Sequence, residues 1–473
     1  MFDADVCYRA LAAKDRRFDG LFFVGVETTG IYCRPVCTAR TPRRDRCSFY
    51  ASSAQAEQAG FRACFVCRPE LAPGASTVDA TERLVRDAVA HVDAGFLNDH
   101  SVDELADRLG VTARHLRRAT NEALGVTPVE LAQTRRLALA KQLLQDTSMS
   151  LADVAFAAGF SSVRRFNASF AERFAMPPSE VRRRAPGGAD ETLRLDFRPP
   201  LAWASLLDFL RVRAIPGVER VDDGYARVVA FGDDVGTIHV TRDPKRAALR
   251  VGVSGTLMPH LMRIVSRVRA LFDLDARPDA IGERLGADHD LAAAVALQPG
   301  LRIPGAFDPF ETLVRTVLGQ QVSVKGATTL AGRFVERYGE RIGEGPLSHR
   351  FPPPERIARA TGIARAVGLP KKRADTLRAV ARAAVDGVFA TTDVERFTEA
   401  LLAIPGVGPW TASYAAMRVL HHPDAFPAAD LGITKTLGVK TAREATDRAE
   451  NWRPWRAYAA MYLWSTPATT KES

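Results

Sequence analysis

Two close pairs of cysteines near the N-terminus could hold a metal ion. Cys33 and Cys37 are separated by three residues. Cys64 and Cys67 are separated by two, and a loop of 26 residues joins the pairs. Zinc favours four soft ligands, and each close pair can form half of a tetrahedral site before the loop closes. Disulfides and plain buried thiols are the alternative interpretations. The two remaining cysteines lack a partner at such a spacing and are interpreted as small core residues: Cys7 and Cys47.

A second chemical site is indicated near the C-terminus. The segment 401–412 (LLAIPGVGPWTA) contains Gly406 and Gly408, which permit a tight hairpin between two helices. Backbone amides at the start of the second helix can then bind a DNA phosphate. Asp430 follows eighteen residues after Ala412. This arrangement resembles the helix-hairpin-helix superfamily of base-excision DNA glycosylases.

The resemblance narrows with three further segments: 307–310 (FDPF), 318–323 (LGQQVS) and 452–459 (WRPWRAYA). Together they are similar to 3-methyladenine DNA glycosylase II, the AlkA type, over residues 193–466. The family implies release of alkylated purines that are flipped out of the duplex. It also implies a base-binding pocket and a DNA-binding hairpin, where a monovalent cation is a further candidate ligand. The residues concerned are Trp410, Tyr414 and Trp464 for the pocket, and Gly406, Gly408 and Thr411 for the hairpin.

Asp430 would be the catalytic carboxylate of such an enzyme. Cleavage of the N-glycosidic bond makes the sugar positive, and a carboxylate can stabilise that charge and activate water. The alternative is that Asp430 only caps the next helix. An electron-rich aromatic pocket would favour positively charged alkylated purines over normal bases.

Two positions refine the expected mechanism. Relatives that also cut the strand have a lysine two residues after the second hairpin glycine, whereas this chain has Trp410, so a monofunctional enzyme is expected. In the family, a leucine enters the gap that the flipped base leaves in the duplex. This chain has Gln321 at that position, so the resemblance does not define which lesions the enzyme excises. Because no cysteine follows Cys67, the four-cysteine iron–sulfur cluster of some relatives is excluded. For the same reason, direct reversal of base damage by an alkylguanine methyltransferase domain is not expected.

The surroundings of the cysteines resemble another family. The segments 28–37 (TTGIYCRPVC), 49–51 (FYA) and 60–67 (GFRACFVC) are similar to the N-terminal domain of Ada-type adaptive-response proteins. That family implies irreversible methyl transfer from a DNA methylphosphotriester to Cys33, with the other three cysteines as remaining ligands and Arg34 as a DNA contact. Four thiolates on Zn²⁺ carry a net charge of −2, and methylation of one would halve it. DNA affinity would then rise, which makes the domain a damage sensor.

Two helix-turn-helix units follow, at 101–118 and 150–167. Each has a serine cap, an apolar stripe and a glycine turn before a polar second helix. The pair resembles the AraC-type DNA-binding domain. Groove-facing candidates are Thr112, Arg114, His115 and Arg118 in the first unit and Ser161, Ser162, Arg164, Arg165 and Asn167 in the second.

We expect these sites to lie in a multidomain chain of mainly α structure with α+β parts. At 473 residues the chain is too long for one core. We expect a zinc domain (1–76), an AraC-type double helix-turn-helix (80–184), a small α+β domain (192–272) and an all-α glycosylase domain (273–473). The first segment ends in a turn-rich stretch at 72–76, and a linker is predicted at 185–189. Alternating residues predict strands at 193–197, 225–231, 237–241 and 248–253, flanked by helices near 201–213 and 258–271.

The charge of the chain agrees with a nucleic-acid partner. Its net charge is +10, although solvated basic faces produce the same signal. No signal peptide or membrane-spanning stretch is evident, so a cytoplasmic, nucleoid-associated protein is expected. The expected partners are alkylated and operator duplex DNA and RNA polymerase, with the chain itself a monomer.

The chain is interpreted as a fusion of a zinc-containing damage sensor, a helix-turn-helix domain that binds operator DNA, and a glycosylase. Such a protein would repair alkylated DNA and activate the transcription of repair genes. One alternative is a regulator whose C-terminal half only binds DNA. The other is a repair enzyme whose N-terminal part only delivers it to DNA.

Overall fold

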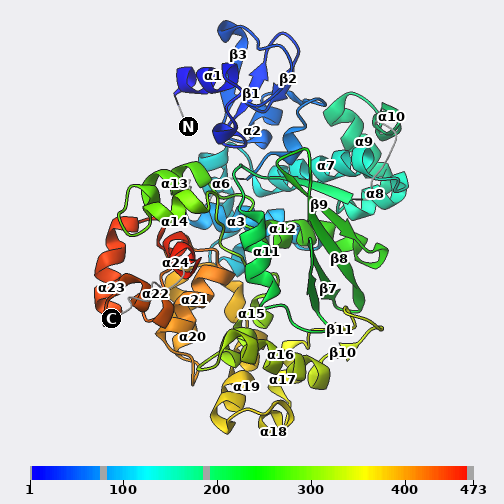
Figure 1. The fold of residues 1–473 in the computed structure, drawn as a ribbon. Coiled ribbons are helices and arrows are strands. Elements are labelled where there is room, and N and C mark those ends of the chain that lie inside the picture. The colour runs from blue at the N-terminus through cyan, green and yellow to red at the C-terminus, as the bar shows by residue number, and fades with distance from the viewer. Residues whose placement is uncertain (1–2, 75–82, 185–191, 466–473) are drawn as a thin grey trace. The chain divides into compact units, whose positions relative to one another are not determined.

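The computed structural model describes residues 3–74, 83–184 and 192–465. Within these, the chain forms two compact units (Figure 1). The first comprises Met1–Pro199 and Arg242–Arg269, and the second Pro200–Thr241 and Ala270–Ser473. The predicted linker at 185–189 and the end of the turn-rich stretch at 72–76 lie outside the described residues.

The zinc-binding part of the first unit is built on a small sheet of order β3-β1-β2-β4. β1 pairs antiparallel with β2 and β3, and β4 is parallel to β2. Cys7 and Cys47 belong to the hydrophobic core beside the sheet, as expected. The elements are α1 (Ala4–Ala12), β1 (Phe23–Val26), β2 (Ile31–Cys33), β3 (Cys47–Tyr50), α2 (Ser53–Gln58) and β4 (Arg62–Ala63).

The predicted helix-turn-helix region is helical throughout its described length. Its long helix α7 separates the two predicted units, each of which has two helices around a glycine with positive φ: Gly110 (+70°) and Gly159 (+84°). The helices are α3 (Arg83–Asp93), α4 (Phe96–Asp99), α5 (Val102–Arg108), α6 (Ala113–Leu124), α7 (Pro128–Asp146), α8 (Leu151–Ala157), α9 (Val163–Phe174) and α10 (Pro178–Arg184).

The α+β region contributes to both units. In the first unit, β5 (Thr192–Asp196) pairs antiparallel with β9 (Ala248–Val253), and most of α12 (Leu261–Leu271) follows. In the second, β6 (Glu219–Val221), β7 (Tyr225–Phe231) and β8 (Asp234–Arg242) form an antiparallel meander after α11 (Trp203–Arg211). The bounds of β7 and β9 agree with the predicted strands, whereas β6 was not predicted.

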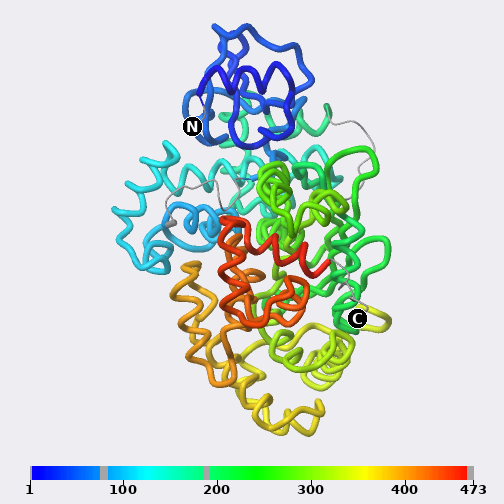
Figure 2. Tube along the Cα trace, turned by 60° about the vertical axis from the view of Figure 1, so that its left-hand side comes forward, coloured from blue at the N-terminus to red at the C-terminus, as the bar shows by residue number. Residues whose placement is uncertain are grey.

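The rest of the second unit is helical apart from a short pair of strands. α15 packs against α19 and α21, and α22 against α24, whose red trace lies beside the orange helices in Figure 2. The elements are α13 (Pro278–Gly286), α14 (Ala292–Leu297), α15 (Pro309–Leu318), α16 (Val324–Tyr338), β10 (Glu340–Arg341), β11 (His349–Arg350), α17 (Pro354–Ala358), α18 (Ile363–Val367), α19 (Lys371–Val385), α20 (Val394–Leu402), α21 (Pro409–Val419), α22 (Leu431–Leu437), α23 (Ala442–Ala449) and α24 (Arg456–Ser465).

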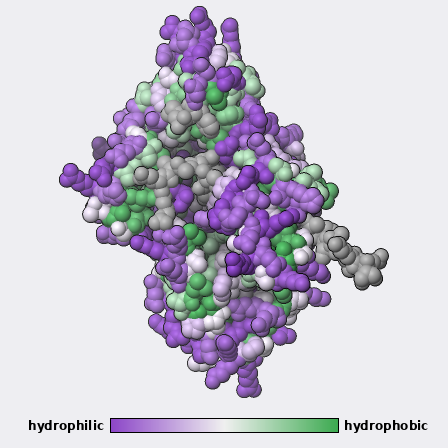
Figure 3. All heavy atoms as spheres, turned by 90° about the vertical axis from the view of Figure 1, so that its left-hand side faces the viewer, coloured by the Kyte–Doolittle hydropathy of each residue, from purple (hydrophilic) through white to green (hydrophobic). Residues whose placement is uncertain are grey.

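The surface is mostly hydrophilic on the face drawn in Figure 3, where apolar residues form small separate patches. Among the described residues, no helix is both long and apolar enough to cross a bilayer.

Candidate zinc and base-excision sites

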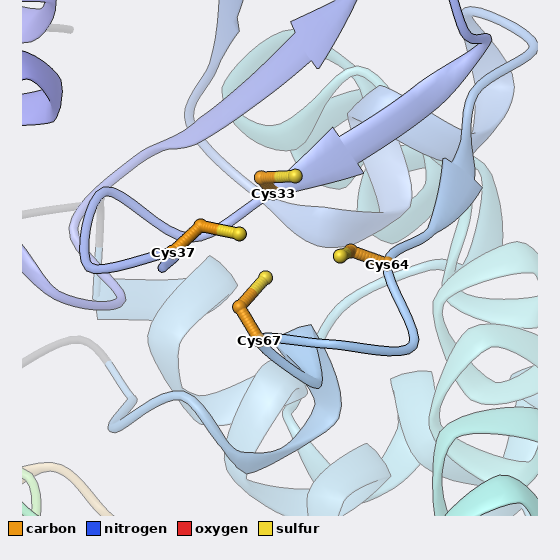
Figure 4. Close-up of side chains that lie close together, drawn as sticks. All are labelled: Cys33, Cys37, Cys64 and Cys67. Carbon is orange, nitrogen blue, oxygen red and sulfur yellow. The ribbon is translucent and has the colours of Figure 1, made fainter. Parts of the chain in front are cut away.

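The four predicted zinc ligands come together in the structure. Their sulfur atoms all lie within 4.8 Å of one another and point toward a shared centre (Figure 4). Cys33 is the last residue of β2 and Cys64 follows β4, so the parallel pairing of these strands brings the two cysteine pairs together. All six cysteines are free thiols, which contradicts the disulfide interpretation.

The chemistry of this donor set fits zinc. Hydrogen bonds among the four thiols lower the pKa of Cys37 to about 7 and that of Cys64 as well. The same hydrogen bonds raise the pKa of Cys33 and of Cys67. Sulfur atoms this close cannot all ionise unless a cation offsets their charge, and four thiolates are a common ligand set of structural zinc.

The four sulfur atoms differ in their backbone contacts. The N–H of Arg34 donates to Cys67 Sγ at 3.3 Å, and the N–H of Val66 donates to Cys64 Sγ at 3.4 Å. Within the described residues, no backbone N–H donates to Cys33 Sγ, and Cys33 is only half-buried. A hydrogen bond lowers the nucleophilicity of a thiolate that accepts it, and Cys64 and Cys67 accept such bonds from the backbone whereas Cys33 does not.

Arg34 does not have the exposure expected of a DNA contact. Its side chain is buried, its Nε donates to Asp19 at 2.8 Å, and its Nη1 donates to Asp196 at 2.8 Å. Burial opposes the charge, yet these two carboxylates raise the pKa of Arg34 above its ordinary value. The guanidinium is therefore already engaged inside the protein, and this environment does not support the predicted contact with DNA.

A buried lysine, which sequence reasoning missed, joins the zinc-binding part to α7. Lys141 Nζ donates to the carbonyl oxygen of Cys64 at 3.0 Å and to Glu70 Oε2 at 2.8 Å. The ammonium group also lies 4.6 Å from the ring centre of Phe65. Nothing in the amphipathic pattern of α7 distinguishes this lysine from an exposed one, because its partners lie some seventy residues earlier in the chain.

The helix-turn-helix candidates lie on or just before the second helix of each unit, α6 or α9. Thr112 caps α6 by accepting from His115 N at 3.2 Å, and Ser162 caps α9 by accepting from Arg165 N at 3.4 Å. The other candidates are exposed on the first two turns of these helices or just before them: Arg114, His115, Arg118, Ser161, Arg164, Arg165 and Asn167. The four arginines are therefore accessible to a DNA backbone.

The predicted hairpin lies between α20 and α21. Gly406 has a φ of +89°, and a Cβ atom there would lie 2.0 Å from Thr376 Oγ1. Gly408 is the N-cap of α21. Gln320 Nε2 donates to the carbonyl oxygen of Gly406 at 3.0 Å and to Thr411 Oγ1 at 3.3 Å. Thr411 is buried, so its side chain supports the hairpin from within.

Asp430 both caps a helix and contacts two of the predicted pocket residues. Its Oδ1 accepts from Gly432 N at 2.9 Å and Ile433 N at 3.1 Å, which caps α22 as the alternative interpretation expected. Trp464 Nε1 donates to the same oxygen at 2.9 Å, and Trp410 Nε1 donates to Oδ2 at 2.9 Å. Helix cap and indoles together fix the orientation of the carboxylate.

The carboxylate lies on the wall of a cavity of about 460 Å³ in the second unit. All three predicted aromatics line it: Trp410 and Tyr414 stack at 5.2 Å between ring centres, and Trp464 lies 6.1 Å from Tyr414. Phe209 and Phe307, which were not predicted, also line it. The cavity volume is in the range of small-molecule sites, and its wall combines aromatic faces with the oriented carboxylate of Asp430.

The same wall carries charged side chains that sequence reasoning missed. Four arginines and two glutamates line the cavity in addition to Asp430: Arg213, Arg227, Arg315, Arg418, Glu219 and Glu311. Arg418 lies four residues after Tyr414 on one face of α21, a spacing that could have indicated it. The others come from distant segments.

Gln321, at the predicted wedge position, lies between α15 and α16. It is exposed and has a φ of +56°, a left-handed conformation that is uncommon for a residue other than glycine. The neighbouring Val322 and Val324 are 40% and 41% exposed and line the cavity. The segment thus presents one polar and two apolar side chains beside the cavity.

Family models match four successive segments of the chain. They describe a metal-binding domain of Ada (6–70), a helix-turn-helix domain (105–184), an AlkA N-terminal domain (192–308) and an HhH-GPD superfamily base excision DNA repair protein (314–451). The order is that expected from the motifs. Together with the four-cysteine cluster, the first match supports a zinc ion as cofactor.

Some relatives match nearly the whole chain, and others match a little more than half of it. The probable bifunctional transcriptional activator/DNA repair enzyme AlkA of Mycobacterium tuberculosis is 41% identical over 98% of this chain and 96% of its own length. DNA-3-methyladenine glycosylase 2 of Escherichia coli is 39% identical over 58% of this chain and 96% of its own. A 3-methyladenine DNA glycosylase structure from Archaeoglobus fulgidus, 20% identical, shares the fold with a TM-score of 0.50 over 57% of this chain and 96% of its own.

The fold and the two sites define a DNA-repair protein that combines a metal-binding domain, a helix-turn-helix region and a helix-hairpin-helix glycosylase fold. The chain belongs to the family of bifunctional transcriptional activator/DNA repair enzymes AlkA.

Proposed function

We propose that the second unit hydrolyses the N-glycosidic bond of alkylated purines in DNA, with Asp430 as the catalytic carboxylate. The observation that carries this proposal is the position of Asp430 on the cavity wall, where two indole N–H groups and a helix N-terminus hold it. A carboxylate fixed in this way can stabilise the positive sugar and accept a proton from the attacking water. Trp410, not a lysine, lies two residues after the second hairpin glycine, which favours a monofunctional hydrolase.

The flipped base would bind among Trp410, Tyr414 and Trp464. The hairpin at Gly406 and Gly408 would hold a DNA phosphate, with Thr411 supporting it and a monovalent cation as a candidate ligand of the hairpin. Gln321 would enter the gap that the base leaves in the duplex, where it can fill space and hydrogen-bond.

The test is base release from methylated duplex DNA by wild type and Asp430→Asn. We expect the wild type to release methylated purines and the variant to lose most of this activity. Asparagine has one acceptor oxygen, which can keep the cap and the hydrogen bond from Trp464, whereas its NH2 group would face Trp410 Nε1. Thermal unfolding of the two proteins is therefore measured as well, and both should be folded at the assay temperature. No release by wild type would leave a regulator whose C-terminal half only binds DNA.

The zinc-binding part is proposed to repair methylphosphotriesters. Cys33, Cys37, Cys64 and Cys67 would hold the zinc ion, which would keep the sulfur atoms as thiolates at neutral pH. Cys33 Sγ would attack the methyl carbon, form an S–C bond and break the C–O bond, whose electron pair returns to the phosphodiester. Cys33 is half-buried and free of backbone donors, which supports this choice.

Methylation of Cys33 would then increase affinity for an operator through the loss of one negative charge. Arg114, Arg118, Arg164 and Arg165 would contact that DNA, and RNA polymerase would be the partner in activation. The protein would act as a monomer associated with the nucleoid in the cytoplasm. The domain limits would be 1–76, 80–184, 192–272 and 273–473.

This second function is tested by the binding of operator DNA before and after incubation with DNA that contains methylphosphotriesters. Wild type should gain affinity and Cys33→Ser should not. Equal affinity of wild type before and after methyl transfer would favour the alternative in which the N-terminal part only delivers the glycosylase.

A further inference from the structure

Damaged DNA has to approach a zinc site that is itself negative. Four thiolates outweigh the charge of one zinc ion, and a methylphosphotriester is neutral, so only the phosphates on either side of the lesion carry charge. These phosphates and the cluster repel each other unless cations lie nearby. Arg34, the residue after Cys33, is not available, because it is buried against Asp19 and Asp196. The cations therefore have to come from other, exposed segments.

The carboxylate of Asp196, which holds Arg34, lies beside a turn of the neighbouring strands. Asp196 is the last residue of β5, and β5 pairs with β9. The next residue, Phe197, donates its N–H to the carbonyl oxygen of Ala247 at 3.0 Å. The turn that joins β8 to β9, residues 243–247, is therefore adjacent to the strand end that contacts Arg34.

This strand end is joined to the zinc-binding part by further buried contacts. Arg198 is buried, and its Nε donates to the carbonyl oxygen of Asp19 at 2.9 Å. Arg34 Nη1 donates both to Asp196 at 2.8 Å and to the carbonyl oxygen of Cys67 at 3.2 Å. All these residues belong to the first unit. Direct contacts thus lead from a predicted zinc ligand through Arg34 to the strand beside the turn.

The turn exposes three cations. Arg242, Lys245 and Arg246 are all exposed. Asp243, the one carboxylate of the turn, is buried and pairs with Arg250 at 3.0 Å. Within the part of the chain that the structure describes, the side chains of the three exposed cations have no ion pair and no hydrogen bond. The turn therefore offers positive charge that the protein does not compensate.

The charge of the turn acts on the pair beside the cysteine cluster. Arg194 lies 2.9 Å from the same carboxylate that holds Arg34, that of Asp196. Burial lowers the pKa of Arg194, Asp196 raises it, and the charges of Arg68 and Arg246 lower it further. Arg246 is therefore close enough to this pair for its charge to be felt there.

We propose that the turn between β8 and β9 is a binding surface for damaged DNA, where Lys245 and Arg246 contact the phosphates that flank the methylphosphotriester. This proposal rests on the methyl-acceptor function of Cys33 proposed above. The two cations supply the DNA contact that buried Arg34 does not make, and they offset the repulsion between the cluster and the flanking phosphates. A segment that matches the AlkA N-terminal domain thus takes part in substrate binding by the metal-binding domain.

The experiment follows methyl transfer from a duplex with a single methylphosphotriester to the zinc-loaded, full-length protein. The variant is Lys245→Gln/Arg246→Gln. It should keep the turn, because Asp243 Oδ1 accepts from the backbone N–H groups of both residues, at 2.8 Å and 3.0 Å. We expect the second-order rate constant to fall about tenfold at roughly 0.1 M salt. The slope of log rate against log salt should become shallower by up to about two.

Three controls distinguish loss of a DNA contact from damage to the cluster. Lys245→Arg/Arg246→Lys keeps both charges and should keep the wild-type rate. Arg220→Gln, at an exposed arginine of β6 in the second unit, should leave the rate unchanged. Methyl iodide methylates a thiolate with release of iodide and needs no DNA, so wild type and the glutamine variant should react with it equally fast.

A second readout does not depend on methyl transfer. A duplex with one methylphosphonate is neutral at that position but has no methyl group that a thiolate can take. Its affinity for the zinc-loaded protein, measured by fluorescence anisotropy, should be lower in the glutamine variant than in wild type and unchanged in Arg220→Gln.

The outcomes separate this inference from the function on which it rests. If the glutamine variant takes methyl groups from DNA at the wild-type rate, the turn does not contact the damaged strand. If its reactions with DNA and with methyl iodide slow by the same factor, the substitutions disturb the cluster, and the inference is again refuted. If wild type takes no methyl group from the methylphosphotriester, the methyl-acceptor function itself is refuted, and this inference falls with it.

Discussion

Trp410 Nε1 donates to Asp430 Oδ2 at 2.9 Å across twenty residues of sequence. Trp410 also stacks on Tyr414, so one indole serves both as a wall of the pocket and as a support of the carboxylate. The same residue stands where strand-cutting relatives have a lysine. Trp410 therefore replaces the lysine that strand cleavage would need, and its N–H group also holds the Asp430 carboxylate in place.

Trp410→Phe should reveal the orienting role. Phenylalanine keeps an aromatic face but removes the N–H donor, and a hydrogen bond to a charged group contributes about 1.5–3 kcal/mol. We expect the single-turnover rate of base release to fall roughly 10- to 100-fold by this estimate, with little change in DNA affinity. Tyr414→Phe provides a comparison that leaves both indoles on Asp430. An unchanged rate in Trp410→Phe would contradict the role of the hydrogen bond.

Gly406→Ala should damage the hairpin by two separate effects. Its φ of +89° is unfavourable for alanine, and the new Cβ atom would lie 2.0 Å from Thr376 Oγ1. Gly387 is a matched control because it has the same φ of +89° but nothing within 4 Å of the added atom. Backbone strain alone should cost Gly387→Ala about 1 kcal/mol, and Gly406→Ala should lose more.

The readouts for this pair are the free energy of unfolding and affinity for an abasic-site duplex. Gly406→Ala should weaken DNA binding, since the strained segment leads into α21, whereas Gly387→Ala should not. Similar losses of stability and affinity in both variants would show that the contact with Thr376 is unimportant.

The sequence was informative where chemistry is carried by residues at fixed spacing. The four cysteines and the hairpin with Asp430 could be predicted because short segments with distinctive motifs define them. Lys141 could not, because its partners lie some seventy residues earlier and only the packing of the chain buries it. Arg213 could not, because only that packing places it on the wall of the same cavity as Tyr414 and Arg418. For Arg34 the resemblance implied a contact with DNA, but the structure pairs this side chain with Asp196. The motif could not indicate that partner, because Asp196 lies 162 residues later. Strand β6 is only three residues long, too short for alternation to be recognised.

Lys141→Met should destabilise the zinc-binding part. The change removes a fully buried cation and leaves Glu70 with only Arg68 as a partner, and breaking a buried pair costs about 3–5 kcal/mol. We expect faster zinc transfer to a chelator, followed with a metal-sensitive dye, while base release by the second unit is unchanged. Glu70→Gln in the same chain should recover part of the loss. Lys14→Met, at an exposed lysine, is the control, and equal zinc release from both lysine variants would contradict the prediction.

The last prediction concerns pH and Asp273. Burial raises the pKa of this carboxyl from 3.8 to about 7, although it accepts from Tyr458 Oη at 2.8 Å. Native protein therefore keeps the proton up to about pH 7, whereas unfolded chain loses it above pH 3.8. Between these values the unfolded state binds fewer protons, so the Asp273 contribution to stability falls as pH rises, by at most about 1.4 kcal/mol per pH unit.

Asp273→Asn cannot ionise and should not show this fall. The nearby His421, whose pKa burial lowers to about 4, acts in the opposite sense between pH 4 and 6.5 and is present in both proteins. The difference in free energy of unfolding between variant and wild type, measured with urea from pH 5 to pH 8, should therefore move in favour of the variant until about pH 7 and then level off. A difference that does not change with pH would mean that Asp273 is already ionised in the native protein at pH 5.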